Sequence, residues 1–81
     1  MPHEPYQPID CSQYDLYEIA IMRGQVLDLV WCNEQGVQQQ ARVKPVGLQT
    51  LNGEEFLLLM RDAQQPDSVE RVRLDRIQSH N

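Results

Sequence analysis

Short apolar segments separated by turn residues fill the chain after Gly24, and this pattern limits the fold more than any other feature. Residues 33–36, Asn-Glu-Gln-Gly, form a turn signal, and Asn52-Gly53 is the dipeptide most typical of a tight β-hairpin. The segments beside these turns alternate between polar and apolar residues, or run apolar over the length of a strand. We predict strands over residues 25–33, 37–46, 54–61, 69–74 and 77–79, with a loop over 62–68 and a tight turn at 74–76.

A small, mainly β barrel is the architecture that we expect for these strands, over residues 25–79. At 81 residues the chain supports one domain with a single core. Closing five short strands into a barrel removes the exposed edges that a small open sheet would leave. Leu27, Leu29 and Trp31 share one face of the first strand by their period of two, and we place them in the core together with the run 56–60.

The segment before the strands is predicted to contain an extended arm and one helix. Prolines at positions 2, 5 and 8 block helix formation, so residues 1–9 form the arm. The helix follows over residues 10–23. Either Asp10 or Ser12 can cap its start, Ser12 with Asp15 resembles a capping box, and Gly24 suits the position just past its end.

Helical spacing suggests which face of this helix is buried. Leu16, Ile19 and Ala20 lie three and four residues apart, so we expect one apolar stripe that packs across an end of the barrel. Asp15 and Glu18 then face solvent, and Tyr14 and Tyr17 flank them. Tyrosine is enriched at binding hot spots, which favours a contact surface on this side.

The charge of the chain is unevenly distributed. The net charge is −5, and residues 1–34 hold six acids against one base, whereas residues 35–81 are balanced. An acidic segment of this kind favours a partner with a basic surface, because complementary potentials steer encounter. It argues against binding a phosphate backbone, which requires basic contacts. The same charge also serves solubility, and acids near a helix start stabilise it, so charge alone leaves the role open.

No pattern in the sequence predicts catalysis, a cofactor or a metal site. The two histidines, His3 and His80, lie near the ends of the chain, and Cys11 and Cys32 have no metal-binding spacing. We expect both cysteines to be reduced thiols in a cytoplasmic protein without a signal peptide. No apolar run reaches the roughly 20 residues that span a bilayer, so we expect no membrane contact.

An RNA-binding barrel is the alternative that the strands allow. It needs basic side chains interleaved with exposed aromatic rings. The six basic residues after position 35 are offset by six acids, and we expect the arginines to pair across strands with Glu54, Glu55, Glu70 and Asp75. An adaptor for some other basic protein is a further alternative.

Two motifs resemble those of the Rof (YaeO) family, small bacterial inhibitors of Rho-dependent transcription termination. The run Tyr-Gln-Pro-Ile-Asp-Cys at 6–11, followed by Tyr14-Asp15 and Glu18, is similar to the start of these proteins. The run Arg-Leu-Asp-Arg-Ile at 73–77 is similar to their ending. The middle, residues 37–52, matches only by its apolar pattern. The resemblance implies an Sm-like fold, with a short helix on a five-strand barrel.

The resemblance also implies a function and a contact surface. A protein of this family binds the N-terminal domain of the Rho helicase at or beside its primary RNA-binding site and prevents RNA loading. The positions that match the family are Tyr14, Asp15 and Glu18, with Asp10 as a secondary candidate, and the chemistry of Glu4 and Tyr17 adds these two. We therefore expect a non-catalytic, monomeric, cytoplasmic protein that binds Rho and does not itself bind nucleic acid.

Overall fold

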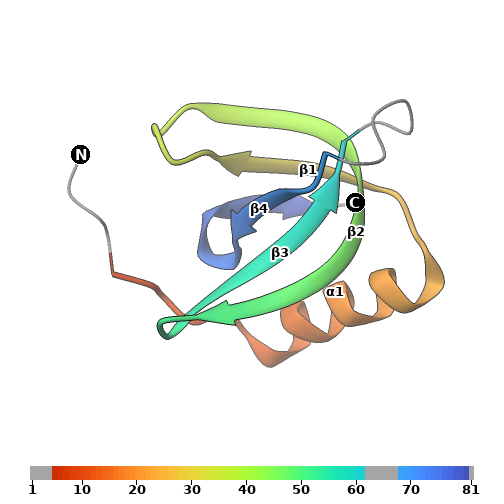
Figure 1. The fold of residues 1–81 in the computed structure, drawn as a ribbon, viewed down its shortest axis with the longest axis horizontal. Helices are drawn as coiled ribbons and strands as arrows, with labels where there is room; N and C mark the ends of the chain where they lie inside the picture. Colours follow the sequence, from red (N-terminus) through yellow and green to blue (C-terminus); the bar gives the residue numbers. More distant parts are fainter. Residues whose placement is uncertain (1–4, 62–67, 81) are drawn as a thin grey trace.

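The fold consists of one helix followed by five strands (Figure 1). A computed structural model describes residues 5–61 and 68–80, so the first four residues of the predicted arm and residues 62–67 of the predicted loop lie outside the described residues. In chain order the elements are α1 (Cys11–Arg23), β1 (Leu27–Cys32), β2 (Gln38–Leu51), β3 (Glu54–Met60), β4 (Glu70–Arg73), the 3-10 helix η1 (Leu74–Arg76) and β5 (Ile77–His80). The class and the order of elements follow the prediction.

The five strands form one antiparallel sheet in the order β4-β3-β2-β1-β5. The long strand β2 curves across the molecule and pairs with β1 through its first half and with β3 through its second (Figure 1). Its register shifts between Pro45 and Gly47, which leaves Val46 as a bulge. The prediction ended this strand near Val46, but the bulge bends the strand instead of stopping it.

The sheet is not closed, and the predicted barrel is not confirmed. Strands β4 and β5 lie at the two ends of the strand order, and each pairs with one neighbour, β3 or β1. Each of these strands is four residues long. The turn η1 joins them through three residues of 3-10 helix and not through a hairpin turn, so the chain leaves β4 without laying β5 alongside it.

The core lies between the curved sheet and α1. Its buried side chains come from every element except β5 and are Tyr17, Leu29, Trp31, Val43, Leu57, Leu59, Val72 and Leu74. Leu29 and Trp31 are buried as predicted, and Leu27 packs against them half-buried. Asn52 and Gly53 both have positive φ, which confirms the tight hairpin between β2 and β3.

The ends of α1 follow from local chemistry. Asp10 occupies the N-cap position with extended backbone, but its side chain makes no capping hydrogen bond. Ser12 lies inside the helix, so the capping box predicted with Asp15 is wrong. Gly24 has φ 63° and ψ 34°, and its N–H donates to Ile21 O while the N–H of Gln25 donates to Ala20 O. This left-handed ending is the one that glycine favours.

The buried face of α1 differs from the predicted stripe. Tyr17 and Ala20 are buried, whereas Leu16 and Ile19 are 49% and 40% exposed. Apolar residues occur on all sides of this helix, so spacing alone did not identify the side that packs on the sheet. The large ring of Tyr17 fills the core beneath the curve of β2, and this turns Leu16 and Ile19 outward. No helix in the described ranges has the length and apolarity that crossing a membrane requires.

Candidate functional site

The residues predicted to bind a partner separate into two groups. Asp15 and Glu18 lie on the exposed side of α1, and Asp10 is exposed at its start. Tyr14 is half-buried at the edge of this side, and Tyr17 points into the core. We call the exposed side that carries Asp15 and Glu18 the acidic face.

Tyr17 is not available for contact with a partner. Its side chain is 2% exposed, and its ring meets the His80 ring edge-on at a centroid distance of 5.5 Å. Burial raises the pKa of Tyr17 to about 12. Tyr17 therefore anchors the helix that carries the acidic face, and its side chain lies in the core and not on the surface where the prediction placed it.

The carboxylates of the acidic face have no basic partner within residues 5–61 and 68–80. Neither Asp15 nor Glu18 makes an ion pair there, and Arg23, the base of the helix, lies in its last turn. By contrast, the exposed acid Asp28 pairs with Arg42 at 3.4 Å. The acidic face therefore keeps a negative potential that a basic partner can neutralise.

Large apolar side chains share this face with the acids. Leu16, Ile19 and Met22 follow one another at intervals of three residues and are 49%, 40% and 84% exposed. We call these three residues the outer stripe. The sequence did not identify it, because the prediction placed Leu16 and Ile19 in the core.

A small cavity of about 250 Å³ opens beside the start of α1. Ile9, Cys11, Tyr14, Asp15 and Glu55 line it. Burial raises the pKa of Tyr14, and the negative charges of Glu55 and then Glu18 raise it further. Glu55 was predicted to pair with an arginine, but it lies beside the helix instead. Only the folded hairpin at Asn52-Gly53 brings Glu55 there, so no local signal identified it.

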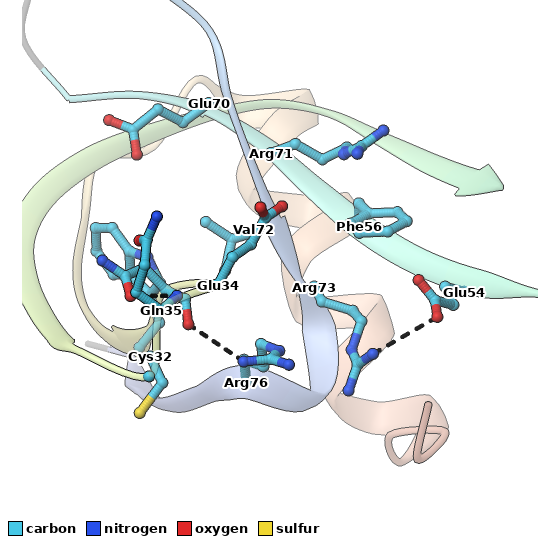
Figure 2. Close-up of a pocket in the computed structure, with 13 residues that line it drawn as sticks. Cys32, Glu34, Gln35, Glu54, Phe56, Glu70, Arg71, Val72, Arg73 and Arg76 are labelled. Atoms are coloured by element: carbon cyan, nitrogen blue, oxygen red, sulfur yellow. Dashed lines mark hydrogen bonds and ion pairs between the residues drawn. The ribbon is translucent and has the colours of Figure 1, made fainter. Parts of the chain in front are cut away.

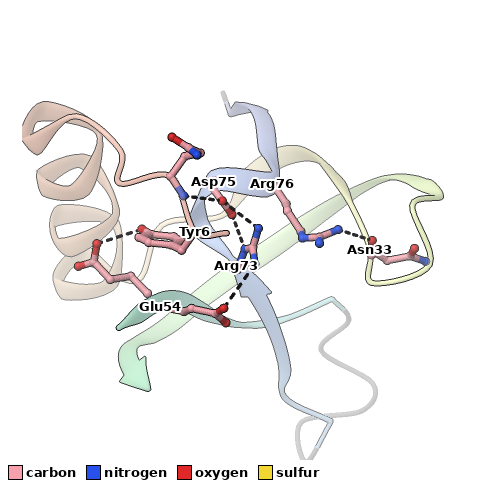
Figure 3. A network of polar contacts seen from close by, with 8 residues as sticks. Tyr6, Asn33, Glu54, Arg73, Asp75 and Arg76 are labelled. Atoms are coloured by element: carbon pink, nitrogen blue, oxygen red, sulfur yellow. Dashed lines mark hydrogen bonds and ion pairs between the residues drawn. The ribbon is translucent and has the colours of Figure 1, made fainter. Parts of the chain in front are cut away.

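The arm is held to the sheet by four residues, Tyr6, Gln7, Arg73 and Asp75, which we call the arm network (Figure 3). Arg73 is 5% exposed and donates from Nε to Asp75 Oδ1 at 2.6 Å and from its second terminal nitrogen to Oδ2 at 3.0 Å. The backbone N–H of Gln7 donates to the same Oδ2 at 2.9 Å.

Tyr6 completes the arm network with its ring and its hydroxyl. The ring lies over the Arg73 guanidinium at 5.8 Å, and the hydroxyl donates to Glu55 Oε1 at 2.9 Å. Burial raises the pKa of Tyr6, and the hydrogen bond and charge of Glu55 raise it further. The segments at 6–11 and 73–77 are thus in direct contact just before α1 begins.

A larger cavity of about 580 Å³ lies between the turn at 33–36 and β4 with η1 (Figure 2). Arg71 extends over the Phe56 ring at 4.5 Å, and Arg76 donates to Asn33 O at 3.2 Å. Carboxylates of Glu34, Glu54 and Glu70 line the same cavity. Its mixed charge does not make the uniformly basic surface that a phosphate backbone requires.

The predicted pairing of arginines with strand acids is confirmed at two arginines. Arg61 pairs with Glu70, and Arg73 pairs with both Glu54 and Asp75. Arg71 rests on an aromatic ring instead. Arg61 and Arg73 are therefore neutralised by carboxylates of the fold, whereas Asp15 and Glu18 have no basic partner in the described residues.

The described residues contain no group of three His, Cys, Asp or Glu side chains that is able to hold a metal ion. Cys11 and Cys32 are free thiols, and Cys32 accepts a contact from Gln78 Nε2 at 3.1 Å. His80 packs against Tyr17, and His3 lies outside the described residues. The strongest candidate site is therefore the acidic face of α1.

Comparison of this chain with protein families, curated proteins and solved structures finds no match.

Proposed function

We propose that this chain is a non-catalytic anti-terminator that binds the N-terminal RNA-binding domain of transcription termination factor Rho and blocks RNA loading. The observation that carries the proposal is the pair Asp15 and Glu18, exposed on one face of α1 without a basic partner in the described residues. The resemblance of the motifs at 6–11 and 73–77 to the Rof (YaeO) family supplies the identity of the partner.

The proposed mechanism is competition for basic side chains. Asp15 and Glu18 pair with lysines and arginines of the partner that would otherwise hold RNA phosphates. Hydrogen bonds between ionised groups are about twice as strong as those between neutral groups. The bound protein then excludes RNA by its volume and by its negative charge, and no bond is made or broken.

The proposal extends to the finer description of the fold and of the protein. We interpret the curved sheet and its covering helix as an Sm-like arrangement in which β2 belongs to both halves. We take the protein to be a cytoplasmic monomer with one domain. Its mixed-charge cavity, lined by Glu34 as well as Arg71, favours protein binding over RNA binding.

Charge reversal tests the proposal. Asp15→Lys and Glu18→Lys remove two attractive contacts and add repulsion, and the combined variant should weaken binding to the purified Rho N-terminal domain by at least about 100-fold. Both residues are exposed, so the fold should be retained, as circular dichroism and thermal unfolding will show. Isothermal titration measures the affinity, and an RNA-loading assay with intact Rho measures the block.

Glu34→Lys is the matched control. Glu34 is exposed in the turn after β1, far along the chain from the helix, and its reversal changes the net charge by the same amount as each test variant. Glu34→Lys should bind as the wild type does. Equal binding by the folded Asp15/Glu18 double variant would contradict the proposal, and so would an equal loss in Glu34→Lys. A gel shift of single-stranded RNA by the protein alone would favour the RNA-binding alternative.

A further inference from the structure

The outer stripe of α1 leaves much of its apolar surface open to solvent. Leu16, Ile19 and Met22 are 49%, 40% and 84% exposed, so each leaves a large part of its apolar surface outside the core. Single exposed apolar residues are common on proteins, but a contiguous apolar patch marks an interaction site. Spacing of three residues makes these side chains neighbours along the helix, so they form one patch.

The acids of α1 lie directly beside this patch. Asp15 is four residues before Ile19, and Glu18 is four residues before Met22, so each carboxylate is the helical neighbour of an apolar side chain. A binding surface commonly has an apolar centre and a polar rim. The exposed side of α1 has this composition within a single helix.

The charge of the face decides between its possible occupants. A second copy of the chain would bring the same face against itself across a two-fold axis, so one interface would hold the Asp15 and Glu18 carboxylates of both copies. Like charges opposed in this way repel, and each copy already carries a net charge of −5. An anionic membrane surface is disfavoured for the same reason. A protein with basic side chains beside an apolar groove complements both the carboxylates of the acidic face and the apolar side chains of the outer stripe.

We infer that the outer stripe is the apolar centre of the partner-binding surface, and that the partner presents an apolar groove bordered by lysine or arginine. This inference rests on the proposed function and adds three contact residues to it. The acids and the stripe then affect different rates. Asp15 and Glu18 raise the association rate and make it salt-dependent, while the outer stripe lowers the dissociation rate.

Truncation of the stripe tests the inference. Met22→Ala and Ile19→Ala introduce alanine, the residue with the highest helix propensity, at exposed positions, so both variants should remain folded. Each should weaken binding to the purified Rho N-terminal domain by about tenfold, mainly through faster dissociation. Between about 0.1 M and about 1 M salt, their affinity should fall by the same factor as that of the wild type.

Two control variants separate the contribution of the outer stripe from that of any exposed apolar side chain and from that of the acids. Val37→Ala truncates an exposed side chain, 55% accessible, in the connection between β1 and β2, and it should bind as the wild type does. Glu18→Gln should slow association and reduce the salt dependence while leaving the dissociation rate closer to that of the wild type.

The outcomes distinguish this inference from the proposed function. If the wild type binds the Rho domain and both stripe variants bind equally well, the inference is overturned and the proposed function stands. If the wild type does not bind, both fail together. Concentration-dependent self-association of the wild type in sedimentation experiments, abolished in Met22→Ala, would assign the stripe to a second copy and also overturn the inference.

Discussion

Each of the three tyrosines meets a different environment. Tyr6 lies over Arg73 and donates to Glu55, Tyr14 is half-buried at the edge of the acidic face, and Tyr17 is enclosed in the core. Burial raises the pKa of all three. At the scale of single residues, therefore, Tyr6 and Tyr17 hold the arm and the helix in place, and Tyr14 is the tyrosine beside the acidic face.

Alkaline pH should destabilise the fold through Tyr17. Its pKa is about 12 in the folded protein and 10.0 without the fold. Below pH 10 the Tyr17 hydroxyl is protonated in the folded and in the unfolded protein, and the free energy of unfolding is not reduced. Above pH 10 the hydroxyl ionises in the unfolded chain first, so the free energy of unfolding falls until the pH reaches the folded pKa. The loss attributable to Tyr17 is on the order of 2 kcal/mol. Urea unfolding across this range measures it.

Tyr17→Phe is the variant that isolates this effect. It removes the ionisable hydroxyl and keeps the ring in the core, so its stability should decline less than that of the wild type above pH 10. Tyr6 contributes in the same direction in both proteins, because its pKa is also raised. An identical decline in the wild type and in Tyr17→Phe would show that Tyr17 is not responsible.

At the scale of elements, α1 shows what a helix sequence does and does not determine. Its end was predictable because Gly24 readily adopts the left-handed conformation that ends a helix. Its start was predicted within one residue, although the Asp10 side chain makes no capping hydrogen bond. Its buried face was not, because Leu16 and Ile19 on one side compete with Tyr17 and Ala20 on the other, and only the shape of the sheet decides between them. Asp15 and Glu18 are exposed as predicted, whereas the outer stripe required the structure.

Gly24→Ala should destabilise the protein by about 1 kcal/mol. The cost comes from the backbone, since φ is +63° and an added Cβ would meet only Lys44 Cε, at 3.9 Å. Gly24→Asn should cost less, because asparagine tolerates this left-handed conformation better than alanine does. Chemical denaturation of the two variants beside the wild type provides the comparison, and equal stability of all three would contradict this account of the helix end.

At the scale of the whole molecule, β2 connects the two parts of the sheet. It pairs with β1 in one half and β3 in the other, and its bend at Val46 sets the angle between them. Local signals predicted most of the strands and the hairpin at Asn52-Gly53, but not the open arrangement. Closure of the sheet depends on the angle that η1 sets between β4 and β5, and no local sequence pattern predicts this angle.

Asp75→Asn should destabilise the whole molecule by about 2 kcal/mol, because it leaves the buried Arg73 guanidinium without its full counter-charge. Hydrogen exchange at the Gln7 amide should accelerate in the same variant, since its acceptor is Asp75. Asp28→Asn is the control: Asp28 and Arg42 are 57% and 77% exposed, and a surface pair of this kind contributes at most about 1 kcal/mol. A similar loss in both variants would contradict the role given to the arm network.

The contact between Gln7 and Asp75 has a consequence for how freely the sequence can vary. The donor is the main-chain N–H of residue 7, and the side chain takes no part in the bond. Every amino acid except proline carries that donor. Position 7 is therefore permissive to nineteen residue types as far as this bond is concerned, whereas position 75 requires an acceptor that reaches both the arm and Arg73.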